Sequence, residues 1–397
     1  MLNIETKQTP KPFALLNLGF RPFFLAAGGF ATIAMLIWMG IVVFGWSIQP
    51  YGSARIWHAH EMIFGYSLAV IAGFLLAAVK NWTNIQTPHG LPLAAIFLLW
   101  LAGRVLPFFS NTIGLDVLAL VDNLFILALL LAVAYPIFKA RQWQHAGILA
   151  ILLFLLASNI VFYYGLLGRN NNAVTIGLYS GLYLIMGLIF LMGRRVIPFF
   201  IERGVDEDVK LTNYKWLDIS SPIVFLAFWF ADLFMTSPAI VAGLAAVLFI
   251  LHAIRLIGWH SRGIWRKPLL WVIYLAYGAL TTGFALKAAV PILGISSLLA
   301  LHAFTVGGIA MMTLGMMARV SLGHTGRNVF EPPPILVIIF GLLFIAAIFR
   351  VLLPMLIPGQ YLLWIGLSQI LWIMSFAMFF MLFLPLLWQP RVDGRFG

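Results

Sequence analysis

The chain has no cysteine, and this absence excludes several kinds of site. Disulfides, iron–sulfur clusters, thiolate-ligated haem, blue-copper centres and covalently attached c-type haem all need cysteine sulfur. Any metal would therefore be held by histidine, methionine or carboxylate side chains.

Charge is almost as scarce as cysteine. Charged residues make up 9% of the 397 positions and hydrophobic residues 63%, whereas an ordinary soluble domain is about 25% charged. Twelve acidic residues cannot cover the surface of a soluble particle of this length, so the composition indicates a polytopic membrane protein. The net charge of +12 lies mostly in short loops. That placement is typical of topology determination and contact with anionic membrane lipid, and we expect no nucleic-acid partner.

Long apolar runs dominate what remains. A helix needs about 20 apolar residues to cross the bilayer core, and this rule predicts an all-α bundle of twelve transmembrane helices. At Ser237-Pro238 one long broken helix is the alternative to a hairpin. The expected spans are 23–46, 57–79, 91–109, 113–136, 146–167, 174–192, 217–236, 238–258, 268–290, 295–320, 335–357 and 361–388.

Basic residues predict the orientation of these spans. With both termini in the cytoplasm, the inner segments carry nineteen Lys and Arg residues. The outer loops together with the outer span ends, to which Arg104 and Arg350 are assigned, carry five, which is a strong positive-inside bias. The first span has no small-residue cleavage site, so we expect it to be retained. We interpret 1–397 as one integral membrane domain, in which a cytoplasmic loop at 193–216 separates six-helix halves at 1–192 and 217–397.

Ionisable residues inside the spans are rare and expensive, and they predict where the chemistry lies. Most fall in the outer half of the predicted bundle, on several different helices. Neutral imidazole is a common ligand for haem iron, copper and zinc. His58, His60 and His302 are therefore candidate metal ligands, and His252 and His324 are weaker ones. The alternative is that these rings only form hydrogen bonds between helices.

Three segments resemble the signatures of the NnrS family of bacterial membrane proteins, and the likeness extends over nearly the whole chain. The first is Gly19-Phe20-Arg21-Pro22-Phe23-Phe24. The second is Trp57-His58-Ala59-His60-Glu61-Met62-Ile63-Phe64-Gly65, followed by Ala72-Gly73-Phe74-Leu75 and Asn81-Trp82-Thr83. The third is His302-Ala303-Phe304-Thr305-Val306-Gly307-Gly308, with Arg319-Val320-Ser321-Leu322-Gly323-His324-Thr325-Gly326-Arg327.

The resemblance implies a twelve-span protein of the bacterial inner membrane that contains haem and copper and takes part in the response to nitric oxide. His58, His60 and His302 would be its metal ligands. Without cysteine the haem would be haem b. His324 lies about 33 Å of helix rise from His302 and cannot serve the same centre.

Other polar residues would then support the metal site. Arg104 and Arg350 would bind haem propionates, or else anchor their helices among lipid head groups. Glu61, Asp122 and Asp232 would carry protons.

Three functions agree with these features. The first is binding of nitric oxide at a periplasmic-side metal site, with reduction or other detoxification as a further step. A secondary transporter of copper or a small anion is the alternative, and a sensor that acts through another protein is the third. The sequence leaves open whether the protein is an oxidoreductase, its electron donor, the number and axial pairing of haems, the copper ligands and whether it forms a homo-oligomer.

Overall fold

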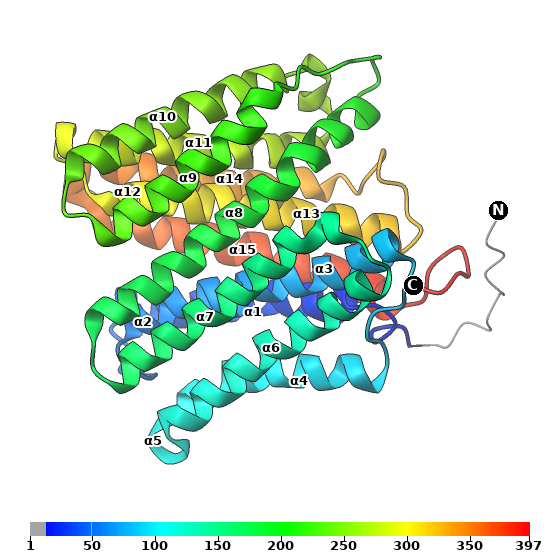
Figure 1. Ribbon diagram of the computed structural model, residues 1–397, viewed down its shortest axis with the longest axis horizontal. Coiled ribbons are helices and arrows are strands. Elements are labelled where there is room, and N and C mark those ends of the chain that lie inside the picture. Colours follow the sequence, from blue (N-terminus) through cyan, green and yellow to red (C-terminus); the bar gives the residue numbers. More distant parts are fainter. Residues whose placement is uncertain (1–12, 49) are drawn as a thin grey trace. The chain divides into compact units, whose positions relative to one another are not determined.

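The computed structural model describes residues 13–48 and 50–397, and its described part is built from helices alone (Figure 1). Helices make up 82% of the described residues. Among these residues, twelve helices are long and apolar enough to cross a membrane, so the predicted all-α class and the predicted number of spans are confirmed. The chain divides into two compact units, which are described separately.

Unit 1 contains the described residues up to Leu184, together with Met317–Val329 and Phe376–Gly397. Within it α3 packs on α1 and α6, and α6 also packs on α4 and α7. Its elements are α1 (Phe20–Phe44), α2 (Ala54–His60), η1 (Glu61–Ser67), α3 (Leu68–Thr83), α4 (Leu91–Val105), η2 (Leu106–Phe109), α5 (Ser110–Ile113), α6 (Leu115–Lys139), η3 (Trp143–His145), α7 (Ala146–Leu167) and the first part of α8 (Asn171–Gly204).

Unit 2 contains Ile185–Met316 and Phe330–Ser375. Here α11 packs on α10, α12 and η5. Besides the second part of α8, the elements that begin in this unit are α9 (Lys215–Phe234), α10 (Pro238–Gly258), η4 (Arg262–Arg266), α11 (Pro268–Leu293), α12 (Ser297–His302), η5 (Ala303–Ala310), α13 (Met311–His324), α14 (Ile335–Leu356), η6 (Pro358–Gln360) and α15 (Tyr361–Trp388). The last turns of α13 and α15 belong to unit 1.

Local signals explain where several helices begin and end. The Ser53 side chain accepts a hydrogen bond from the Ile56 amide and caps α2. Gly45, with a φ of 67°, ends α1 in the left-handed conformation that glycine adopts without strain. Pro238 stands in the first turn of α10, so the hairpin is present and one long broken helix is excluded. The connection after α8 is shorter than expected, because α8 continues to Gly204.

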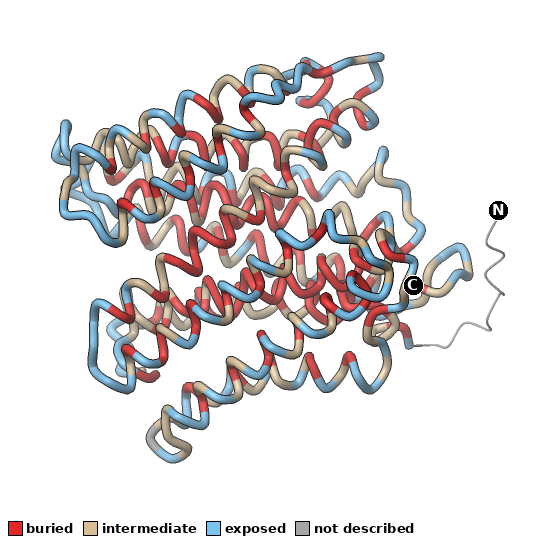
Figure 2. Tube along the Cα trace, in the orientation of Figure 1, coloured by how far each residue is buried: buried red, intermediate tan, exposed pale blue. Residues whose placement is uncertain are grey.

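Two spans contain a π-helical segment directly after a histidine. His60 ends α2 and is followed by η1, and His302 ends α12 and is followed by η5. These spans are also the most enclosed, since 83% and 78% of the residues in their apolar stretches are buried (Figure 2). Because π-helical segments within α-helices are frequent at functional sites, both positions are places to look for chemistry.

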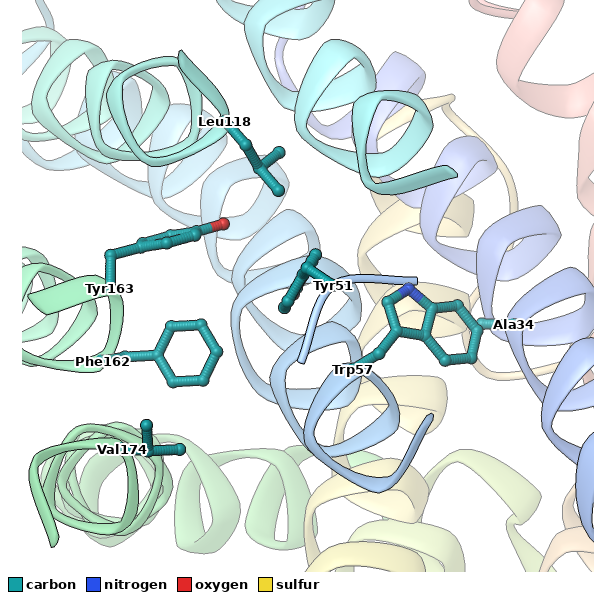
Figure 3. Packing of buried hydrophobic residues seen from close by; sticks show 7 residues of the cluster. All are labelled: Ala34, Tyr51, Trp57, Leu118, Phe162, Tyr163 and Val174. Atoms are coloured by element: carbon teal, nitrogen blue, oxygen red, sulfur yellow. The ribbon is translucent and has the colours of Figure 1, made fainter. Parts of the chain in front are cut away.

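A hydrophobic cluster in unit 1 surrounds the start of the second span. Figure 3 shows aromatic and aliphatic side chains from the chain before α2 and from helices α1, α2, α6, α7 and α8 approaching one another. Its fully buried members are Ala34, Tyr51, Trp57, Leu118, Phe162, Tyr163 and Val174. This cluster holds Tyr51 and Tyr163, whose hydroxyl groups reach the polar residues described next.

Candidate functional site

A network of polar side chains lies buried in unit 1, and we call it the unit 1 network. Its members come from the chain before α2 and from α2, η1, α4, α6 and α7. None is more than 3% exposed. Buried polar groups on this scale need hydrogen-bond partners, because an unpaired polar group is costly inside a membrane. The members are Tyr51, His60, Glu61, Arg104, Asp122, Asn159 and Tyr163.

The Arg104 guanidinium joins the two carboxylates of the network. Its Nη1 donates to Glu61 Oε2 at 2.5 Å, and its Nη2 donates to Asp122 Oδ1. Two glycines make room for this approach. A Cβ at Gly65 would stand 2.6 Å from Arg104 Nη1, and one at Gly103 would stand 2.7 Å from Asp122 Oδ1. The small residues therefore let a charged bridge form between helices η1, α4 and α6.

Both ring nitrogens of His60 are engaged inside the network. Nε2 lies 2.9 Å from Asn159 Oδ1 and 3.3 Å from Asp122 Oδ2, and both oxygens are acceptors, so Nε2 carries a proton. Nδ1 lies 2.7 Å from the Tyr51 hydroxyl and 3.3 Å from Glu61 Oε1. Burial raises the pKa of Tyr51 well above its usual value, so its hydroxyl keeps its proton. His60 is thus a hydrogen-bonding residue at the centre of the network.

Charge balance shows what the network can hold. Asn159 Nδ2 and the Tyr163 hydroxyl both donate to Asp122 Oδ2, at 3.1 and 3.3 Å, which favours that carboxylate in its ionised form. Two ionised carboxylates and one guanidinium leave one negative charge, which one further proton on His60 or a carboxylate would cancel. Neutrality is favoured inside a membrane because an uncompensated buried charge is costly. The chain of hydrogen bonds can therefore hold one proton and move it among these groups.

His58 lies apart from this network. Its ring stacks on the Trp38 indole of α1, with 4.4 Å between ring centroids and an angle of 4° between the planes. The two histidines of the His-x-His segment thus meet different surroundings, because His58 stacks on Trp38 whereas His60 stacks on Phe162 and is also hydrogen-bonded within the unit 1 network.

In unit 2, His302 and Arg350 are in contact. His302 Nδ1 donates to the Leu298 carbonyl at 2.7 Å, which leaves Nε2 as an acceptor. Arg350 Nη2 donates to this Nε2 at 3.1 Å. The Arg350 guanidinium also stands over the Tyr361 ring, 5.9 Å from its centroid. The structure therefore brings two of the predicted site residues together within one unit.

Asp232 is neutralised by a residue that our sequence analysis did not select. Lys287 of α11 lies inside an apolar run, and its Nζ is 2.6 Å from Asp232 Oδ1. Asn159 and the two tyrosines of the unit 1 network were also missed. Lys287 and Asn159 could have been found by applying the cost of intramembrane polar groups to every span. Tyr51 and Tyr163 carry no such signal, because tyrosine is common near membrane surfaces.

The two weaker histidine candidates have separate surroundings. His252 is 1% exposed and stacks on Phe190, and its Nδ1 lies 2.6 Å from the Tyr277 hydroxyl. His324 ends α13, where its ring lies 5.4 Å from that of Phe20. In the described part of the chain, no group of three or more histidines and carboxylates is arranged to hold a metal ion.

Comparison with known protein families shows which family the chain belongs to. The profile of one family, described as NnrS protein, matches residues 14–391 of the chain. The chain belongs to the NnrS family. A search of curated proteins returned no match. The resemblance noted from the three segments is thereby confirmed, and the protein is a multi-pass membrane protein of this family.

The three NnrS-like segments occupy defined positions in the structure. The first begins α1, and the second runs through α2, η1 and α3. The third has two parts: His302–Gly308 lies at the end of α12 and in η5, and Arg319–Arg327 covers the end of α13 and the loop after it. The family resemblance therefore falls on both π-helical segments, on the start of α1 and on the end of α13.

Proposed function

We propose that this protein of the bacterial inner membrane binds nitric oxide and removes it as part of the cell's response to nitric oxide. The proposal includes haem b and copper, a site toward the periplasm and an electron donor that is a separate protein. Membership of the NnrS family and two histidine–arginine neighbourhoods beside π-helical segments support it.

The residues around His302 fit a haem ligand. A metal-binding histidine usually donates its second ring N–H to a carbonyl or carboxylate, which orients the ring. His302 does so through Leu298, and its Nε2 would bind iron after Arg350 Nη2, which donates to it in this structure, has moved away. When bound, haem would supply a ferrous iron that captures nitric oxide. Arg350 would then hold a haem propionate, since guanidinium and carboxylate form paired hydrogen bonds.

His60 and copper fit less well. Both His60 nitrogens already face partners in the unit 1 network, so ligation would disrupt that network. The described residues form no three-ligand group for a metal ion, and we derive no step through copper. His58, stacked on Trp38, is the remaining ligand candidate in unit 1.

The chain's own contribution is the handling of protons. Glu61 and Asp122 share the unit 1 network with His60, and hydroxyl groups from Tyr51 and Tyr163 extend it. Reduction of nitric oxide consumes protons, and a continuous buried network is a suitable place to keep one. Asp232, beside Lys287, is a second proposed position in unit 2.

Visible spectroscopy of the purified full-length chain tests the proposal. We expect a Soret band that shifts when nitric oxide is added to the reduced protein, and that is lost in His302→Ala. His89→Ala, which changes an exposed loop histidine, is the matched control and should keep the band. A colourless preparation that takes up neither haem nor nitric oxide would contradict the proposal. Consumption of nitric oxide with an added electron donor would separate an enzyme from a sensor.

Orientation is part of this proposal, since the site is placed toward the periplasm. The positive-inside bias supports cytoplasmic termini. Alkaline phosphatase, which is active only outside the cytoplasm, should be active when fused within the 45–53 connection and inactive when fused after Gly397. The reverse pattern would place the site on the cytoplasmic side.

A secondary transporter is the second candidate, and the two π-helical segments favour it. Interrupted helices near the middle of a span often line the substrate site of a transporter. Uptake of copper or a small anion by proteoliposomes, together with a metal-free spectrum, would select this alternative.

A further inference from the structure

Arg21 is a fully buried arginine at the start of α1, with 0% of its surface exposed. Its Nη1 donates to the carbonyls of Leu387 and Gln389, at 2.8 and 2.7 Å, where α15 ends. A guanidinium has five N–H donors, and this contact uses only part of them. Nε and Nη2 are buried without a hydrogen-bond partner. The side chain therefore offers more donors than the described residues accept.

Other cations surround this guanidinium. Arg327 and Arg391 lie within electrostatic range of Arg21, and Arg327 Nη1 is also buried without a hydrogen-bond partner. Lys80 lies within electrostatic range of His324, as do Arg21 and Arg391. We call Arg21, Lys80, Arg327 and Arg391 the basic end cluster.

One acidic residue neutralises part of this positive charge. Asp393 pairs with Arg391 through both of its oxygens, at 2.8 and 2.5 Å. Within the described residues, neither Arg21 nor Arg327 forms an ion pair with a carboxylate. In Figure 1 the end of α15, in red, lies beside the start of α1, in blue. The cluster thus gathers positive charge where the ends of several helices meet.

Capping of the α15 C-terminus accounts for only one nitrogen of the basic end cluster, Arg21 Nη1. A cation at a helix C-terminus is stabilised by the last carbonyls and by the helix dipole, and Arg21 Nη1 meets that description. Capping needs neither the three N–H groups on Arg21 Nε and Nη2 nor a second arginine near them. Like charges held together in a buried place repel, and a bound anion would relieve the repulsion.

We propose that the basic end cluster binds a phosphate group through Arg21 and Arg327. Planar guanidinium groups match phosphate oxygens with paired hydrogen bonds. The phosphate belongs either to an anionic lipid head group or to a small soluble phosphate compound. Both occur at the cytoplasmic face of a membrane, and the charge asymmetry predicts that this end of unit 1 is cytoplasmic. The site is separate from the proposed nitric oxide chemistry, and its test does not depend on it.

Thermal unfolding of the delipidated full-length chain in neutral detergent tests the site. Sodium phosphate is compared with sodium chloride at equal ionic strength. Reconstitution in phosphatidylcholine with or without phosphatidylglycerol, followed by native mass spectrometry, forms the lipid arm. We expect a saturable rise in the unfolding midpoint with phosphate, or selective retention of phosphatidylglycerol. A phosphate effect assigns a soluble ligand, and phosphatidylglycerol retention alone assigns a lipid.

Variants connect that effect to the cluster. Arg327→Gln leaves the carbonyl contacts of Arg21 in place and should weaken the apparent affinity at least tenfold. Arg262→Gln removes an exposed positive charge from η4 of unit 2 and should behave as wild type. If Arg327→Gln does not fold, Arg327→Lys, which keeps the charge but not the paired donors, should show a smaller loss. Equal responses in wild type and the Arg327 variants, an equal loss in Arg262→Gln, or no specific effect in wild type would overturn the proposal.

Discussion

Arg104→Met is expected to lower the free energy of unfolding by about 3–5 kcal/mol, because it leaves two buried carboxylates without their cation. Glu61 and Asp122 both accept from this guanidinium, and all three side chains are at most 2% exposed. Unfolding of the purified chain by dodecyl sulfate titration, followed by circular dichroism, measures the change. Loss of folded protein from the membrane fraction would be the corresponding effect in cells.

Two comparisons show whether charge is the cause. Arg55→Met removes an exposed arginine of α2 and should change stability by less than about 0.5 kcal/mol. Combining Arg104→Met with Glu61→Gln and Asp122→Asn removes all three charges and should recover much of the lost stability. A triple variant as unstable as Arg104→Met would instead assign the effect to packing of the arginine side chain.

Lys287→Met is expected to cost about 3 kcal/mol in unit 2, since it takes the cationic partner from Asp232 inside a span. The ion pair is slightly more exposed than the unit 1 network, with side chains 17% and 10% exposed, so we expect a smaller loss than for Arg104→Met. The same titration measures it.

The double variant Lys287→Met with Asp232→Asn provides the internal control. It keeps the helix but removes both charges, and it should be more stable than Lys287→Met alone. Lys210→Met, at an exposed lysine in the same unit, should resemble wild type. If the single and double variants are equally unstable, the ion pair does not support the fold.

Much of the candidate site could be predicted from the sequence. The cost of polar groups inside a membrane points to His58, His60, Glu61 and Asp122, and Arg104 is predicted as a partner of haem propionates. Four of these five belong to the unit 1 network, whereas His58 lies apart from it and stacks on Trp38.

Their partners could not be predicted in the same way. Arg104 and Glu61 are 43 positions apart, and His60 and Asn159 are 99 apart. Which residues meet depends on how the helices rotate and pack. The composition of a helix does not indicate which neighbouring helix its polar face will contact. Arg104, which is expected to bind a haem propionate, lies between two carboxylates of the chain itself, and the sequence does not indicate this pairing.

The amino-acid sequence by itself determined the class of protein, the number of spans and the membership of a family. The first two depend on local composition, because a bilayer selects any apolar run long enough to cross it. Family membership depends on the particular residues along the matched length of the chain. Only the tertiary structure decided that His60 is enclosed by hydrogen bonds, that Lys287 neutralises Asp232 and that Arg21 retains unused donors. Leaving any of these groups unpaired would cost several kcal/mol of folding free energy because they are buried, and they become buried only when the helices pack.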